Sequence, residues 1–329
     1  VRKAAERTPN HSQRTNTSVL MLVDLVKRSQ PLPATAKLLI LGCGYSGAVL
    51  ARLIRAHGTP LLCTRREPRC DNSNLRFDSA AGIVPAMDAL DGVTHVISTI
   101  PPTSAGEEPV LSTLLPLLHR LEPHWVGYLS TTGVYGDRAG EWVSEDDAPA
   151  PTQERSRKRL NCEDAWRASG LPVQILRLPG IYGPGRSVLN TLKQGRARII
   201  HKPDQVFCRI HVEDIAGACL HLMHMASQGQ RPEVVNICDN RPAPSGDLIR
   251  LGASLMNQPP PAEECFEEAK QGMSAMARSF WSDNRRVSNQ RLIRTLGYEL
   301  LHPDFEVGLR DCWQQDALNQ EPKETLAHQ

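Results

Sequence analysis

Short apolar runs of strand length alternate with longer stretches of helical periodicity along most of the chain. Strands are predicted at Leu38–Leu41, Leu61–Thr64, Leu75–Asp78, Val93–Ile100, Trp125–Ser130, Val173–Arg177 and Val234–Cys238. Helices are predicted at Ala48–His57, Val84–Leu90, Val110–Leu121, Glu154–Ala168, Val188–Gln194 and Ser245–Met256, the last with Ser245 as its N-cap. The stretch His211–Leu222 starts extended and becomes helical. Strands that alternate with helices predict an α/β fold with a parallel, doubly wound sheet and right-handed crossovers.

The first strand leads into a glycine-rich loop. Its sequence is Gly42-Cys-Gly44-Tyr-Ser-Gly47, and a helical stretch follows. Between a strand and a helix, this spacing is typical of a dinucleotide-binding Rossmann domain. Gly42 permits the tight turn, Gly44 lets the backbone approach a pyrophosphate, and Gly47 lets the helix pack closely on the strand. The N–H groups of Tyr45 and Ser46 open the helix and attract phosphate. A glycine-rich turn without a ligand is the alternative.

The pattern divides the chain into four parts. Residues 1–36 are predicted to be a poorly ordered extension, with a short helix as the alternative for its apolar segment Val19–Val26. Residues 37–178 form the Rossmann domain. Residues 179–317 form a smaller substrate-side region with segments that return to the Rossmann sheet, and 318–329 is a frayed tail.

Composition excludes several classes of partner. The 329 residues carry 38 basic and 36 acidic side chains, a net charge of +2, so neither nucleic acid nor a membrane surface is an expected partner. No apolar run is long enough to span a bilayer. Nine cysteines are scattered without Cys-x-x-Cys spacing, which predicts a reducing, cytoplasmic compartment and no zinc site.

Three later motifs join the glycine loop in the order found in one superfamily. They are Ser130-Thr-Thr-Gly-Val-Tyr-Gly136, Arg177-Leu-Pro-Gly-Ile-Tyr-Gly-Pro-Gly185 and Ile210-His-Val-Glu-Asp214-Ile-Ala. Over residues 37–303 the chain resembles the short-chain dehydrogenase/reductase superfamily, in its extended NAD-dependent epimerase/dehydratase-like branch, and is most similar to the atypical YeeZ-like group. The resemblance implies NAD(P) binding and a small-molecule substrate. It leaves a homodimer open, because helices flanking this sheet often form a dimer interface in the family.

The catalytic signature of that superfamily is changed in this sequence. The resemblance implies a Tyr-x-x-x-Lys pair, with a glutamate four residues beyond the lysine. With Glu163 as that glutamate, Arg159 stands at the lysine position and Arg155 at the tyrosine position. An arginine at position 159 can bind ribose or phosphate but cannot deliver a proton at neutral pH.

Cofactor contacts follow from the strand ends. Arg65 and Arg66 come after the second strand, where an NAD enzyme commonly has an acid that binds the ribose hydroxyls, so NADP(H) is favoured. NAD(H) is the alternative, and Glu67 supports it, because it lies about twenty residues beyond the glycine loop, where such an acid is expected. The resemblance places Asp78 at the adenine, unless it is a turn residue. It also implies cofactor contacts for residues at two further strand ends: Thr99, Ile100, Pro101, Pro179 and Ile181.

Substrate and proton-transfer residues are fewer. Thr131 aligns with the catalytic Ser/Thr, or it caps the turn after its strand. Tyr135 replaces the missing acid/base, or it packs beside the site. Arg186 and Arg209 are candidate contacts to an anionic substrate such as a nucleotide-sugar pyrophosphate, and His201 and His211 are weaker candidates, His211 favoured as structural.

Two functions remain at this stage. The first is an NADP(H)-binding oxidoreductase or epimerase-like protein that acts on a nucleotide sugar or a small carbonyl or alcohol. The second is a non-catalytic NADP(H)-binding redox sensor or partner-binding module. The absent Tyr/Lys pair motivates the second.

Overall fold

A seven-stranded parallel sheet lies at the centre of the computed structural model, which describes residues 22–67 and 74–318. The strand order is β11-β7-β5-β4-β1-β2-β3. The bounds are β1 (Leu38–Leu41), β2 (Leu61–Arg65), β3 (Asn74–Arg76), β4 (His95–Ser98), β5 (Trp125–Thr131), β7 (Val173–Leu178) and β11 (Val234–Asn236). All seven predicted strands are present, and the doubly wound parallel sheet is confirmed.

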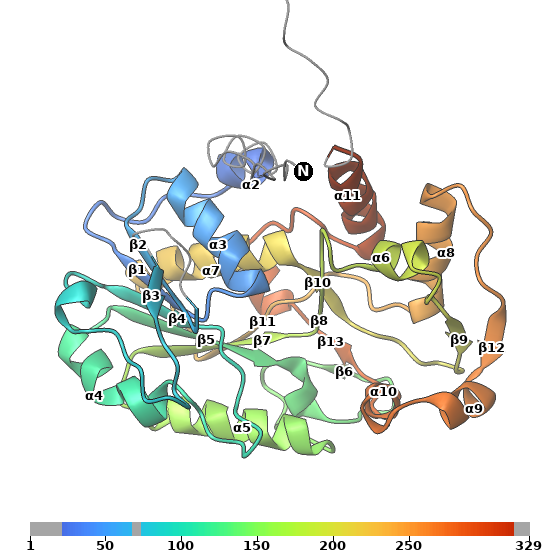
Figure 1. Cartoon of the computed structure of the whole chain (residues 1–329), viewed down its shortest axis with the longest axis horizontal. Coiled ribbons are helices and arrows are strands. Elements are labelled where there is room, and N and C mark those ends of the chain that lie inside the picture. The colour runs from blue at the N-terminus through green and yellow to red at the C-terminus, as the bar shows by residue number, and fades with distance from the viewer. Residues whose placement is uncertain (1–21, 68–73, 319–329) are drawn as a thin grey trace, which may run out of the picture.

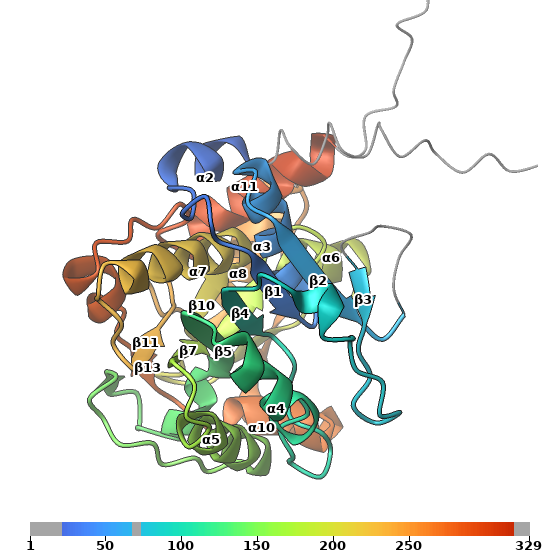
Figure 2. The same ribbon diagram turned by 90° about the vertical axis from the view of Figure 1, so that its left-hand side faces the viewer.

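Helices cover both faces of this sheet. In Figures 1 and 2, α3 (Tyr45–Ala56) and α7 (Val212–Ser227) lie on one face, and α4 (Leu111–Leu121) and α5 (Glu154–Arg167) lie on the other. Side chains of β1 alternate between the two layers. Leu38 and Ile40 pack with the α3–α7 side, whereas Leu39 and Leu41 pack with α4 and α5. Because both faces are buried, the strand is a continuous apolar run.

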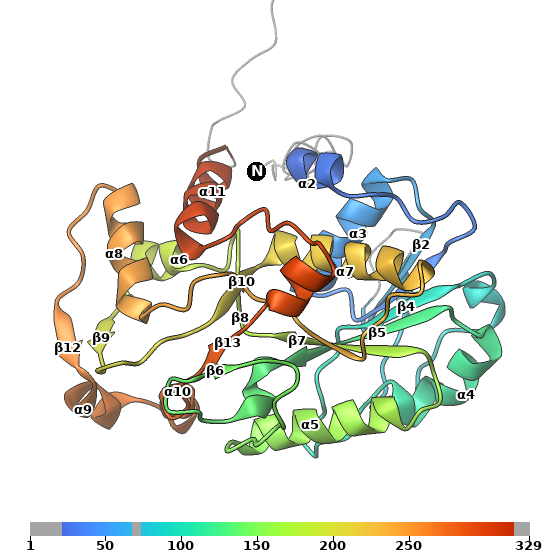
Figure 3. The ribbon, with the colours of Figure 1, turned by 180° about the vertical axis from the view of Figure 1, so that it is seen from behind.

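A smaller lobe extends from the carboxyl ends of the strands (Figure 3). Its strands form three parallel pairs: β8 (Gly180–Tyr182) with β10 (Arg209–His211), β9 (Ile199–His201) with β12 (Glu263–Cys265), and β6 (Trp142–Val143) with β13 (Arg286–Val287). Its helices are α6 (Val188–Lys193), α8 (Ser245–Leu255), α9 (Phe266–Ala269), α10 (Ala275–Trp281) and α11 (Phe305–Leu318). The chain leaves the sheet after β7 and returns to it for α7 and β11.

Two local predictions were wrong. The helix expected at Val84–Leu90 is a single 3-10 turn over Asp88–Leu90, because Pro85 interrupts the stretch and lacks an N–H to donate. Ser245 is the first residue of α8 and does not cap it. The N-cap is Pro244, whose φ of −56° and ψ of 148° place it in the extended region before the helix.

The start of the described chain is packed onto the sheet layer. Helix α2 (Val23–Arg28) is the short helix that was one alternative for the N-terminal extension, and Leu22, Leu25, Leu32 and Ala36 are buried against the α3–α7 side. Residues 22–36 are therefore part of the fold. The rest of the predicted extension, and the predicted tail beyond Leu318, lie outside the described residues. Across residues 22–67 and 74–318, every helix is too short or too polar to cross a membrane.

A buried carboxyl group at the start of α4 makes stability depend on pH. Glu108 is 7% exposed, and its Oε2 accepts the N–H of Leu111 at 2.6 Å, whereas Oε1 has no hydrogen-bond partner among the described residues. Burial raises the pKa of Glu108 to about 6 from its usual 4.5. The folded state therefore holds the proton more tightly than the unfolded state, so this group's stabilising effect is present below pH 4.5 and is lost as the pH rises through about 6.

We expect Glu108→Gln to remove this dependence. Relative to the variant, the wild type should lose about 2 kcal/mol of unfolding free energy between about pH 4 and pH 8, because the pKa of Glu108 rises from 4.5 to about 6 on folding. Urea unfolding at both pH values measures the difference. Glu107→Gln, at the exposed neighbouring position, is the control and should give a constant difference from the wild type. A constant difference for Glu108→Gln as well would contradict the assignment.

Candidate functional site

The glycine loop joins β1 to α3 in a conformation that requires two of its glycines. Gly42 has a φ of +85°, and a Cβ there would lie 2.6 Å from Cγ1 of Ile100. A Cβ on Gly47 would lie 3.0 Å from the carbonyl oxygen of Gly42. Gly44 differs, because a Cβ there meets nothing closer than 4.0 Å. Gly42 and Gly47 are therefore required by close packing, whereas Gly44 leaves open space next to the backbone.

The loop is held from two strand ends. Thr64 on β2 accepts the N–H of Gly42 at its Oγ1 (2.9 Å), and Thr99 after β4 donates its hydroxyl to the carbonyl of Gly42. Gly44 is the N-cap of α3 and supplies no side-chain cap. The N–H groups at the start of this helix are therefore available to an anion at the loop.

A cavity of about 1130 Å³ opens over this loop and the carboxyl ends of β2, β3 and β4. The structure brings most of the predicted cofactor residues to it, and with them the predicted substrate residue Arg186. The cofactor residues are Gly42, Gly44, Tyr45, Ser46, Arg65, Arg66, Asp78, Thr99, Ile100, Pro101, Arg159 and Ile181. Gly47 lies beneath the loop, where α3 packs on β1. We call this space the loop cavity.

One end of the loop cavity is basic. Arg65 and Arg76 are paired across β2 and β3, and Arg66 follows directly. The Nε of Arg65 is buried and has no hydrogen-bond partner among the described residues. Asp78 accepts the N–H groups of Ala80 and Ala81 at one oxygen, at 3.1 and 3.3 Å, which is the geometry of the turn residue given as its alternative. A buried, unpaired guanidinium nitrogen fits a phosphate at this end.

A thiol pair lies under the same loop. A hydrogen bond from the side chain of Cys63 lowers the pKa of the Cys43 thiol. Burial raises this pKa, and the positive charge of Arg65 lowers it further. Cys43 lines the loop cavity and is itself buried. The positive charge of Arg65 therefore adds to the effect of Cys63 in favouring a negative charge at Cys43.

A second cavity, of about 850 Å³, adjoins the loop cavity and reaches toward the smaller lobe. We call it the lobe cavity. The two share residues, among them Pro101, Ser130, Arg159, Ile181 and Arg186. Of the remaining predicted site residues, Thr131, Pro179 and Arg209 line the lobe cavity, whereas His201 and His211 line neither cavity.

Cations dominate the lining of the lobe cavity. They are Arg155, Lys158, Arg159, Arg186, Arg209 and Arg285. One acid lies beside them, Asp283, and its Oδ2 is 3.2 Å from Nη1 of Arg285. The balance of charge is therefore positive, and the lining is suited to an anion.

Helix α5 presents two of these arginines. Arg155, Arg159 and Glu163 are spaced by four residues, so they lie along one side of the helix. Nη1 of Arg159 donates to the hydroxyl of Tyr128 (3.0 Å) and to the carbonyl of Leu129 (3.1 Å). These bonds fix its guanidinium at the junction of the two cavities.

Arg209 and Arg186 approach from the smaller lobe. Nη1 of Arg209 donates to the carbonyls of Phe207 (2.8 Å) and Ala243 (3.0 Å), and burial lowers its pKa. Arg186 stacks on the ring of Tyr45, with 5.5 Å from its Cζ to the ring centroid. The hydroxyl of Tyr45 donates to the carbonyl of Pro184 at 3.0 Å, which ties the turn that carries Arg186 to the glycine-loop helix.

The structure separates the two predicted catalytic residues. Thr131 lines the lobe cavity, and its Oγ1 also accepts the N–H of Gly133 at 3.1 Å, so the capping alternative holds in part while the hydroxyl proton remains free to be donated. Tyr135 is fully buried, and its hydroxyl donates to Oδ1 of Asn236 at 2.9 Å. Burial raises its pKa. The structure therefore favours the alternative for Tyr135, that it packs beside the site, because the residue lines neither cavity.

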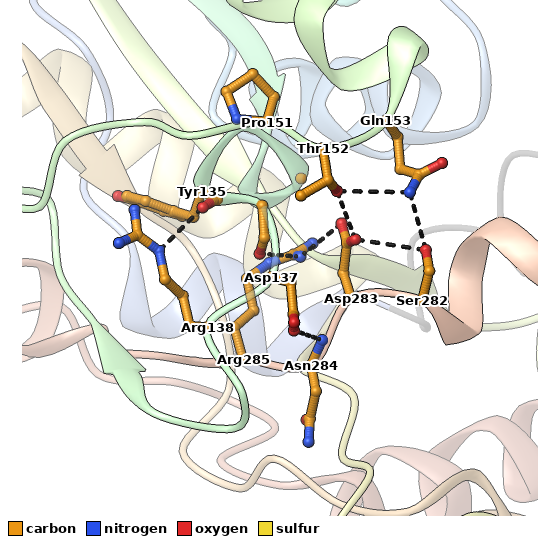
Figure 4. Close-up of polar contacts among 12 residues, drawn as sticks. Tyr135, Asp137, Arg138, Pro151, Thr152, Gln153, Ser282, Asp283, Asn284 and Arg285 are labelled. Atoms are coloured by element: carbon orange, nitrogen blue, oxygen red, sulfur yellow. Dashed lines mark hydrogen bonds and ion pairs between the residues drawn. The ribbon is translucent and has the colours of Figure 1, made fainter.

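Part of the lobe cavity lies in a region where the sequence analysis identified no site residues. Figure 4 shows how the segment Ser282–Arg285 is fastened to the loop after β5. Asp283 accepts the hydroxyl proton of Thr152 (2.6 Å), and Nη1 of Arg285 donates to the carbonyl of Gly136 (2.8 Å). In the sequence, the only sign of this part of the cavity lining is a run of aromatic and charged residues at 280–286, which shows neither helical nor strand periodicity.

Comparison with known proteins identifies the relatives of this chain. Residues 38–238 match the family model described as the NAD dependent epimerase/dehydratase family. A solved structure of a conserved protein of unknown function from Silicibacter pomeroyi DSS is 38% identical, with a TM-score of 0.76, over 86% of this chain and 99% of that one.

Two further matches are more distant. Protein YeeZ of Escherichia coli (strain K12) is 25% identical over 82% of this chain and 97% of its own length. The structure of MoeE5 in complex with UDP-glucuronic acid and NAD is 20% identical over 86% of this chain and all of that one, with a TM-score of 0.69, which shows a shared fold.

Proposed function

Because the chain belongs to the NAD-dependent epimerase/dehydratase family, we propose that it is an NADP(H)-dependent oxidoreductase or epimerase with an anionic substrate. The observation that carries this proposal is the pair of adjoining cavities, one over the glycine loop and one lined by six cations. A nucleotide sugar is the substrate class that fits best, since its pyrophosphate matches the arginines. A small anionic carbonyl or alcohol compound is the alternative.

The residues of the loop cavity fit the dinucleotide. Gly44 leaves room for the pyrophosphate at the start of α3, and the unpaired Nε of Arg65 supports a phosphate on the adenosine ribose. NADP(H) is proposed over NAD(H) because arginines stand where an acid would receive the ribose hydroxyls.

The bound cofactor supplies or accepts a hydride. This chain's own residues bind and orient the substrate next to it. Arg155, Arg159 and Arg209 hold the anionic group, and the bonds that already fix Arg159 and Arg209 reduce the entropy lost on binding. The hydroxyl of Thr131 donates a hydrogen bond to the carbonyl or alcohol oxygen of the substrate.

A second candidate is a non-catalytic NADP(H)-binding sensor. It is favoured by the buried phenol of Tyr135 and by Arg155 in the place where the resemblance implies a proton donor. Consumption of NADPH with any member of a panel of nucleotide sugars and carbonyl compounds would exclude it. Cofactor binding without turnover, together with a partner that binds only in the presence of the cofactor, would support it.

We expect Arg65→Ala/Arg66→Ala to weaken NADPH binding by at least about tenfold, since each hydrogen bond between charged groups contributes about 1.5–3 kcal/mol. Binding of NADH should change little, because it lacks the 2′-phosphate. Isothermal titration calorimetry with both nucleotides measures the effect.

Arg120→Ala/Arg294→Ala is the matched control. It removes the same charge from two exposed positions outside both cavities and should leave both affinities unchanged. Equal weakening of NADPH and NADH by the Arg65→Ala/Arg66→Ala variant would refute the preference for NADP(H), and no binding of either nucleotide by the wild type would refute the proposed function.

A further inference from the structure

A group of metal-ligating side chains lies outside both cavities, where β10 and α7 meet the last helix. His211 ends β10, His302 lies in the loop before α11, and Asp311 is on α11. The two histidines are 0% and 3% exposed, and Asp311 is partly exposed. Two distant parts of the chain, β10 and the segment that leads into α11, therefore bring three ligand atoms within 4.8 Å of one another.

The separations suit one bound ion. Nε2 of His302 is 3.5 Å and Nε2 of His211 is 3.9 Å from Oδ2 of Asp311, and the three ligand atoms all lie within 4.8 Å of one another. Ligands bound tetrahedrally at about 2.0–2.2 Å stand roughly 3.3–3.5 Å apart. Ordinary N–H···O hydrogen bonds are shorter, at about 2.7–3.2 Å. The two contacts to Asp311 are thus too long for good hydrogen bonds. The 3.5 Å separation matches the spacing of ligands around a metal, and the 3.9 Å separation exceeds it by about 0.4 Å.

The other nitrogen of His302 is already oriented for this role. Its Nδ1 is 3.0 Å from Oδ2 of Asp214, which also accepts the N–H of His302 at 2.9 Å, and Oδ1 accepts the N–H of Leu301 at 2.7 Å. A carboxylate that holds Nδ1–H leaves Nε2 facing Asp311, where a metal ion would replace the proton of Nε2. Metal-binding histidines are commonly oriented by such a carboxylate.

His211 needs one rearrangement of a proton. Its Nδ1 now accepts the N–H of Glu213 at a long 3.3 Å, so the proton is on Nε2. Metal binding at Nε2 moves the proton to Nδ1, so the Glu213 N–H loses this acceptor, and Oε2 of Glu213, now 4.0 Å from Nδ1, must move about 1 Å closer to accept the new N–H. Glu213 is thus the carboxylate next to the far nitrogen of His211, as Asp214 is for His302.

We propose that His211, His302 and Asp311 bind a divalent transition-metal ion that connects α11 to the β10–α7 junction. Two imidazoles and one carboxylate select a metal such as zinc over magnesium or calcium, which prefer oxygen ligands. The site is structural, because its ligands line neither cavity and metal binding adds to the stability of the folded state.

The test uses the full-length chain, stripped with a chelator and titrated with Zn²⁺ by calorimetry, and separately with Co²⁺ by its visible ligand-field absorption. We expect one ion per chain and a rise in melting temperature on addition of Zn²⁺. Asp311→Asn and His302→Gln should each weaken Zn²⁺ binding at least about tenfold and abolish that rise. None of these readouts depends on cofactor binding or turnover.

His201→Gln is the matched control, since His201 is an exposed histidine with Nδ1 3.8 Å from Glu263 and should bind no ion of its own. Should the buried His302→Gln variant fail to fold, the partly exposed Asp311→Asn variant decides the question. The proposal is overturned if the wild type binds no stoichiometric Zn²⁺, if it binds Mg²⁺ equally well, or if Asp311→Asn binds Zn²⁺ as the wild type does.

Discussion

Gly44→Ala is expected to weaken NADPH binding at least about tenfold while lowering the melting temperature of the unliganded protein by only about 2–4 °C. The new methyl group meets nothing in the protein closer than 4.0 Å, and the φ of −81° is one that alanine adopts, whereas the ψ of −146° lies outside the α and β regions and costs about 1 kcal/mol. The fold therefore accepts the substitution at a small cost. The space that the methyl group enters is the space proposed for the pyrophosphate, so the loss should be confined to binding.

Substitution of the first glycine of the loop should instead reduce the stability of the fold. Gly42→Ala combines a φ of +85° with a Cβ 2.6 Å from Ile100. A left-handed backbone costs about 1–2 kcal/mol and overpacking about 1–3 kcal/mol, so we expect about 2–5 kcal/mol of lost stability. Calorimetric titration and thermal melts of both variants separate the two effects. A Gly44→Ala variant that binds NADPH as tightly as the wild type would show that no phosphate approaches this loop.

Glu163→Gln is expected to destabilise the fold by about 3–5 kcal/mol, the typical result of leaving one member of a buried ion pair without its partner. Glu163 is 0% and Arg177 2% exposed, and they form two bonds, at 2.7 and 3.1 Å. Ser130, which faces Arg177 across β5 and β7, donates its hydroxyl to the same carboxylate at 2.5 Å. This cluster fastens α5 to the sheet and so positions Arg155 and Arg159 at the lobe cavity.

A pair on the same helix gives the comparison. Glu154 and Lys158 are 2.9 Å apart, and Glu154 is 72% exposed, so water screens the pair and Glu154→Gln should change stability far less than Glu163→Gln does. Replacing both buried partners, as Glu163→Leu/Arg177→Met, should recover much of the loss, because no charge is then left unpaired. Urea unfolding of Glu163→Leu, Arg177→Met and the double variant, beside the wild type, completes a double-mutant cycle. A cost for Glu163→Gln no larger than that for Glu154→Gln would contradict a strong buried pair.

The features that the sequence predicted depend on neighbours along the chain. The seven strands, the glycine loop and the arginines after β2 are each encoded within about ten residues, by apolar periodicity or by a motif. What the sequence left open depends on tertiary contacts. It did not decide whether Tyr135 takes part in catalysis or packs beside the site, and in the structure its hydroxyl donates to Asn236 on β11, a strand about a hundred residues later.

The smaller lobe was the least predictable part. Arg285 and Asp283 reach the lobe cavity because hydrogen bonds tie their segment to the loop after β5. No periodicity or motif in the sequence predicts these hydrogen bonds. The cluster of His211, His302 and Asp311 shows the same limitation, since its members are up to 100 residues apart and cysteine spacing predicts nothing about it.

The path of the chain also determines how this protein can be divided. The smaller lobe is built largely from two excursions, one between β7 and α7 and one after β11, so no single cut separates it from the sheet. A fragment ending at residue 178 would leave β7 as an exposed edge and strip α7 from the sheet. A chimera that keeps this sheet and takes its specificity from a relative must therefore exchange two internal segments together, with junctions on either side of α7 and β11.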